Sequence, residues 1–95
     1  MRQKFNPGRL VATPGALAAC SHRRLMVCLG RHLSGDWGEA CPPEDREENE
    51  HAFGLGLRLL SAYFINPERG RDDGVLWLIT EADRSSTTML LPDEY

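Results

Sequence analysis

The sequence predicts a small α+β domain in which N-terminal helices pack on one face of a three- to four-stranded antiparallel sheet. In the first half of the chain, apolar residues recur three to four positions apart, which is the period of a helix. From Leu57 onward, aliphatic and aromatic runs are bounded by polar turn residues, which is typical of strands. A chain of 95 residues has room for one hydrophobic core, so we expect residues 1–95 to form a single domain.

The N-terminal part predicts an extended segment followed by a short helix. Residues 1–12 contain turn residues and isolated apolar anchors, so we expect them to be extended. Thr13 and Pro14 mark a helix start, because a threonine side chain caps the first N–H groups and proline lacks an N–H that would stay unpaired there. This helix is expected over Gly15–Cys20.

Two further helices are expected before the strands begin. Ser21 can cap a helix over Arg23–Leu33, in which leucines recur four positions apart and create one apolar face. Gly35 follows that helix where a left-handed glycine commonly ends one. Pro43 opens a third helix that runs to about Phe53, with acidic residues in its first turns, where the helix dipole favours anions.

Three strands are expected in the second half of the chain, over Leu57–Ile65, Val75–Thr80 and Ser86–Leu91. The polar loop 66–74 and a short turn join them, and such local connections favour an antiparallel meander. The extended residues 1–12 are candidates for a fourth strand. Helices followed by strands favour an α+β arrangement, with the apolar helix faces on one side of the sheet.

Charge is distributed unevenly along the chain. Residues 1–35 carry six basic side chains, Arg2 among them, and no acidic one, whereas residues 36–95 carry five basic and fourteen acidic side chains. Two interpretations stay open, because the halves can neutralise each other in the fold or can steer a charged partner to one face. The acidic residues are densest over residues 44–50. This segment is either a solvated helix face or a surface that binds a basic partner.

The cysteines and histidines do not form a metal-binding pattern. They are Cys20, Cys28, Cys41, His22, His32 and His51. No C-x-x-C pair occurs, so we expect no metal and no cofactor, and we expect the first two cysteines to be small core residues. The composition, the lack of a long apolar run and the lack of a secretory signal predict a cytoplasmic protein without a membrane partner.

One set of polar residues suggests catalysis. His32 can transfer protons near neutral pH, Arg58 or Arg84 can hold a phosphate, and Thr87 can donate a hydrogen bond to it. Such a set can cleave RNA without a metal, because the ribose 2′-hydroxyl is the nucleophile. In the alternative interpretation these residues are structural: His32 lies with Arg31 at a helix C-terminus, and Thr87 is an ordinary strand former. The chain contains no phosphate-binding glycine loop and no nucleophile-elbow motif.

Four segments, Val11–Leu17, Arg31–Gly38, Arg58–Tyr63 and Trp77–Pro92, are similar to a family of small plasmid-related proteins from plasmids and integrative elements of proteobacteria. The resemblance implies a mobile-element setting, in which small proteins often inhibit host defences such as CRISPR or restriction complexes. It supplies no catalytic residues. The loop 66–74 is longer than in that pattern.

We therefore expect a non-enzymatic interaction protein that uses an acidic surface to block a protein partner, in the first instance a nucleic-acid-binding defence complex. The expected contact residues are Glu44, Asp45, Glu47, Glu48, Glu50 and an exposed Trp37. One alternative is a metal-independent ribonuclease-like domain of the barnase and colicin type, an analogy that rests on the order of helices and strands. Another is a homodimer formed through an exposed sheet edge. Direct binding of nucleic acid is left open.

Overall fold

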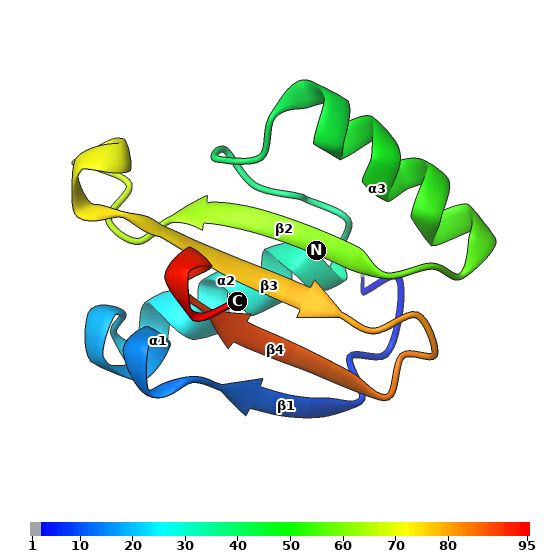
Figure 1. Cartoon of the computed structure of the whole chain (residues 1–95), viewed down its shortest axis with the longest axis horizontal. Coiled ribbons are helices and arrows are strands. Elements are labelled where there is room, and N and C mark those ends of the chain that lie inside the picture. The colour runs from blue at the N-terminus through cyan, green and yellow to red at the C-terminus, as the bar shows by residue number, and fades with distance from the viewer. Residues whose placement is uncertain (1–2) are drawn as a thin grey trace.

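The computed structural model describes residues 3–95 and has the expected α+β fold, with three α-helices and a four-stranded sheet (Figure 1). In chain order, the elements are β1 (Arg9–Ala12), α1 (Pro14–Ala19), α2 (His22–Leu33), α3 (Pro43–Leu55), β2 (Leu59–Phe64), β3 (Val75–Thr80) and β4 (Ser86–Leu90). Two short 3₁₀ helices, η1 (Gly70–Asp73) and η2 (Pro92–Glu94), follow β2 and β4. Arg2, counted above among the basic residues, lies outside the described residues.

The sheet is mixed, with strand order β1-β4-β3-β2. The expected meander is confirmed, because β2 pairs antiparallel with β3 and β3 pairs antiparallel with β4. The N-terminal segment adds the fourth strand, but β1 runs parallel to β4, so the prediction of a purely antiparallel sheet is wrong. Most of the chain separates these two strands, so no tight hairpin turn forces an antiparallel pairing.

α1 and α2 cover one face of the sheet, whereas α3 lies along the outer side of β2 (Figure 1). The main core between α1, α2 and the sheet is apolar and contains Ala16, Cys20, Leu25, Cys28, Leu29, Leu33, Tyr63, Leu76, Leu78 and Met89. η2 follows β4 onto the opposite face, where the rings of Trp77 and Tyr95 meet edge to face at 5.9 Å. Within residues 3–95, no helix is long and apolar enough to cross a membrane.

The helix boundaries follow the expected capping residues. The Thr13 hydroxyl accepts a hydrogen bond from Ala16 N–H at 3.2 Å, and the Ser21 hydroxyl accepts one from Arg24 N–H at 3.0 Å. Gly35 has φ +84° just after α2, which is the left-handed conformation expected there. α3 runs two residues further than predicted.

Candidate interaction surface

α3 contacts the rest of the protein through a polar side. Arg46, Asn49, Glu50 and Phe53 are spaced three or four residues apart, so they share one side of the helix. The Arg46 guanidinium donates to two carbonyls of the loop before the helix, at 2.9 and 3.0 Å. Phe53 packs against the ring of Phe5, with centroids 6.0 Å apart. Hydrogen bonds therefore replace much of the apolar stripe that a surface helix usually buries.

Asn49 joins α3 to the edge of β2. Its side-chain amide donates to the carbonyl of Leu60 at 2.5 Å and accepts from the N–H of Leu60 at 3.0 Å. A neighbouring strand would form the same two bonds, so Asn49 takes the place of a strand residue. Asn49 is 5% exposed, and the pair of bonds fixes the position of the helix.

The remaining outward groups of β2 are paired as well. Ala62 accepts from the N–H of Ala40 at 3.1 Å and donates to the carbonyl of Trp37 at 3.0 Å. The Phe64 N–H donates to Glu39 Oε1 at 3.1 Å. The Phe64 carbonyl accepts from the Arg24 guanidinium at 2.7 Å. This edge is thereby closed to another strand.

The opposite side of α3 carries unpaired negative charge. Glu44, Asp45, Glu47 and Glu48 are all exposed. Within the part of the chain that the structure describes, none of these four carboxylates forms an ion pair or a side-chain hydrogen bond. We call these four residues the acidic face. The arginines of the described part of the chain form no ion pair with it, which leaves it free for a cationic partner.

Glu50 differs from the acidic face, because its Oε1 accepts a hydrogen bond from the Trp37 indole N–H at 2.8 Å. Trp37 is only 5% exposed, so the prediction that it is exposed is wrong. The reason lies in the adjacent loop, where Gly38 has φ +100° and a Cβ there would lie 2.0 Å from the carbonyl oxygen of Ala62. The loop therefore packs directly against β2, where Trp37 O also accepts from the Ala62 N–H, and the indole meets the ring of His32 at 5.9 Å.

A groove that the sequence did not reveal borders the acidic face. It has a volume of about 630 Å³ and lies between α3 and the C-terminal Tyr95, over the face of the sheet opposite α2. Asp45 and Glu48 line it together with the apolar side chains of Leu57 and Leu60, and Arg58 also lines it. Charge and apolar surface therefore lie side by side, which favours a partner with cationic side chains next to an apolar anchor.

His32 lies at the centre of a buried polar chain. Its Nδ1 lies 2.5 Å from the Ser61 hydroxyl, and its Nε2 lies 2.8 Å from the Thr80 hydroxyl. The Thr80 hydroxyl is 2.7 Å from that of Thr87, which donates to the carbonyl of Pro7 at 2.8 Å. Burial, with a smaller contribution from a nearby arginine, lowers the pKa of His32 to about 4, so the imidazole is neutral near pH 7.

The four residues of the ribonuclease hypothesis do not converge on a surface. The Thr80 hydroxyl links His32 to Thr87, but the side chains of both residues are buried, at 0% exposed. Arg58 lies on the opposite face, 5.1 Å from the ring of Tyr95. Arg84 has φ +61°, and its guanidinium lies 5.5 Å from the Phe5 ring. The arrangement gives RNA no access to the imidazole in this conformation.

Arg31 and His32 lie in the last turn of α2, as the structural interpretation expects, and Arg31 also forms an ion-pair cluster there. Arg31 Nε donates to Asp36 at 2.7 Å, and Arg31 Nη1 lies 2.9 Å from Glu39 Oε2. The hydrogen bond from Arg31 is the largest cause of the lowered pKa of Asp36. Tyr63 donates its hydroxyl to the carbonyl of Asp36 at 2.6 Å. The cluster links α2 to the loop before α3 and is structural.

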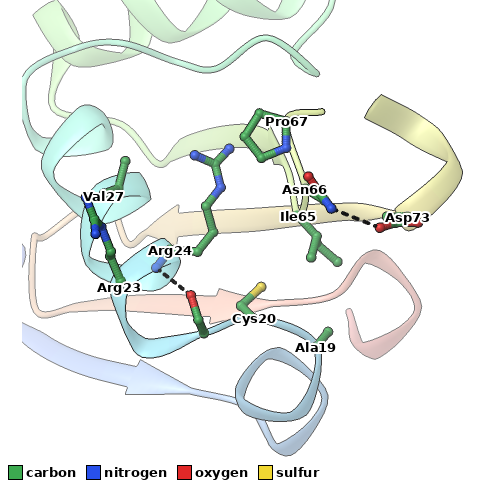
Figure 2. Close-up of a pocket in the computed structure, with 10 residues that line it drawn as sticks. Ala19, Cys20, Arg23, Arg24, Val27, Ile65, Asn66, Pro67 and Asp73 are labelled. Atoms are coloured by element: carbon green, nitrogen blue, oxygen red, sulfur yellow. Dashed lines mark hydrogen bonds between the residues drawn. The ribbon is translucent and has the colours of Figure 1, made fainter. Parts of the chain in front are cut away.

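A second cleft, of about 480 Å³, lies between the start of α2 and the end of β2 (Figure 2). The Arg24 side chain extends along it and is already engaged by the Phe64 carbonyl. Burial raises the pKa of the Cys20 thiol, which opposes formation of a nucleophilic thiolate. Among residues 3–95, no group of three His, Cys, Asp or Glu side chains is placed to hold a metal ion.

The expectation that Cys20 and Cys28 are core residues is confirmed, because both are buried and neither forms a disulfide.

Of the surfaces described above, the acidic face and its groove are the best-supported candidate site. Comparisons with protein-family models, with curated proteins and with solved structures give no match to this chain.

Proposed function

We propose that this protein is a non-catalytic binding module whose acidic face docks onto a basic, nucleic-acid-binding surface of a protein partner. The observation that carries the proposal is the set of four exposed carboxylates that form no ion pair with any of residues 3–95. The four carboxylates lie within the first turns of α3 and form a compact patch of negative charge. A basic channel that attracts nucleic-acid phosphates attracts such a patch as well.

The anchoring of α3 supports the same proposal. Asn49 and Arg46 fix the helix by hydrogen bonds, so little conformational entropy is lost when a partner binds the acidic face. The adjoining groove supplies apolar area of the kind that the centre of an interface needs. The mobile-element setting implied by the resemblance makes CRISPR and restriction complexes the first partners to test.

The test measures displacement of labelled DNA from a purified CRISPR effector complex and from a purified restriction enzyme. In the test variant, Glu44→Gln, Glu47→Gln and Glu48→Gln neutralise three of the four carboxylates of the acidic face but leave Glu50 bonded to Trp37. The matched control combines Glu68→Gln, Asp72→Asn and Asp93→Asn, three exposed acidic residues outside α3. Both variants change the net charge equally.

The native protein is expected to displace DNA from at least one of these complexes, and less effectively at high salt. Loss of three partner ion pairs, at about 0.2–1 kcal/mol each, predicts that the test variant binds roughly 3- to 160-fold more weakly. The control variant should bind as the native protein does. Equal weakening in both variants, or no displacement of DNA from either complex, would refute the proposal in this form.

The ribonuclease-like alternative predicts a different result for the same protein. It requires cleavage of RNA in the presence of a chelator and loss of that activity in His32→Ala. Because His32 is 0% exposed, we expect RNA to stay intact over a long incubation, as judged by gel electrophoresis. Chelator-resistant cleavage that disappears in His32→Ala would favour the enzyme.

A further inference from the structure

The edge of the sheet at β1 differs from the closed edge at β2. Arg9 and Thr13 donate their N–H groups to carbonyls on the β4 side, at 2.9 and 3.0 Å. Because ladder bonds alternate along a strand, the N–H and C=O groups of Leu10 and Ala12 point away from β4. Within residues 3–95, these four groups have no hydrogen-bond partner. An open edge of this kind is a template for another strand.

The residues of β1 restrict how a second β1 strand could pair with it. With two antiparallel copies and Val11 opposite Val11, each Leu10 pairs with an Ala12, and all the free groups are used. A shift of two residues in one direction brings Pro14, which has no N–H, into the ladder. A shift of two residues in the opposite direction places Gly8 in the ladder, but the Gly8 N–H already donates to the Asn6 side chain at 2.9 Å. One register is therefore favoured.

Side chains support the same register. Val11 is 38% exposed and Leu10 is 47% exposed, so pairing removes apolar surface from water. Arg9 would face Thr13 of the second copy, whose hydroxyl donates to the carboxylate of Glu94 at 2.5 Å. Arg9 forms no ion pair among the described residues, so this carboxylate offers it a complementary charge.

We propose that a second copy of this chain pairs antiparallel with the open edge of β1, with Val11 on the two-fold axis. The four strands of each copy then form one continuous sheet. Because α3 lies at the far edge of the sheet from β1, the dimer carries one acidic face at each outer end (Figure 1). The dimer does not depend on the proposed function and can be tested without any partner.

The first test is sedimentation velocity over a range of about 5 μM to 1 mM, because a short strand pairing gives a small interface and a weak dimer. Val11→Lys places two like charges opposite each other and should weaken association at least tenfold. The control is Val27→Lys, at a valine of α2 that is 44% exposed, which should associate as the native protein does. A native protein that stays monomeric, or a dimer that Val11→Lys leaves intact, overturns the proposal.

The second test fixes the register by oxidation. Val11→Cys brings two thiols together at a non-hydrogen-bonded pair, where Cα atoms lie about 4.5 Å apart, so a disulfide-linked dimer should form. Leu10→Cys places the thiols on a diagonal about 7–8 Å apart and should cross-link much more slowly. The native protein, whose three cysteines are buried, serves as the background. Equal cross-linking of the two variants contradicts this register.

Discussion

His32 makes the stability of this protein depend on pH. Its folded-state pKa of about 4 lies below the ordinary value of 6.5 because burial disfavours the charged imidazole. As pH falls below 6.5, the unfolded chain binds a proton that the folded chain excludes, so the free energy of unfolding decreases until the pH reaches about 4. The decrease should approach about 1.4 kcal/mol per pH unit, or about 3 kcal/mol in all, in urea unfolding at several pH values.

Two variants separate His32 from other titrating groups. His32→Gln removes the titrating ring, and its free energy of unfolding should change little between about pH 7 and pH 5, where most carboxyl groups stay charged. His51→Gln changes an exposed histidine and should keep the native slope. An unaltered slope in His32→Gln would assign the pH dependence elsewhere, even if that variant is less stable throughout.

At the scale of elements, the position of α3 depends on Asn49, whose side chain forms with Leu60 the two hydrogen bonds that a neighbouring strand would form. Asn49→Asp keeps an acceptor for the Leu60 N–H but cannot donate to the Leu60 carbonyl, which then loses its partner. An unsatisfied buried acceptor costs about 1–3 kcal/mol, so the free energy of unfolding should fall by that amount. Hydrogen exchange at Leu60 should also become faster, since the edge of β2 opens more often.

Glu48→Gln is the control for this change, since it makes the reverse exchange of carboxylate for carboxamide at a neighbouring exposed side chain without a backbone partner among the described residues. Its free energy of unfolding should stay within about 0.5 kcal/mol of the native value. If both substitutions lower the free energy of unfolding equally, loss of the bond to the Leu60 carbonyl is not the cause.

The sequence predicted the elements whose signals are local. Thr13 and Ser21 cap helices as expected, and the leucine spacing of α2 marks a face that is buried. The packing side of α3 could not be predicted, because Arg46 and Asn49 resemble solvated residues until their backbone partners are known. The parallel direction of β1 was missed for a related reason, since its partner strand is distant in the sequence.

At the scale of the whole molecule, the sequence located the charge of the candidate site but not its shape. The exposure of Glu44, Glu47 and Glu48 follows from a helix whose other side is anchored, and this matches the expectation of a free acidic segment. The inward position of Trp37 and the groove beside Tyr95 depend on contacts between distant segments. Such contacts leave no periodic signal in a single sequence.

Glu94 ties the C-terminal part of the chain to the start of α1, and this connection predicts a cooperative effect. Its carboxylate accepts from the Thr13 hydroxyl at 2.5 Å, from Gly15 N–H at 3.0 Å and from Leu91 N–H at 2.8 Å. Glu94→Gln keeps the shape but weakens these bonds to a charge, so the melting temperature should fall by about 2–6 °C.

Asp93→Asn removes the same charge from the adjacent residue, whose side chain has no hydrogen bond or ion pair within residues 3–95, and should leave the melting temperature nearly unchanged. Because Glu94 joins segments about 80 positions apart, its loss should lower protection from hydrogen exchange in α1 and in the segment after β4 together. Faster exchange confined to the residues after β4 would show that Glu94 stabilises only that segment and not the start of α1. The start of α1 would then be held by the Thr13 cap alone.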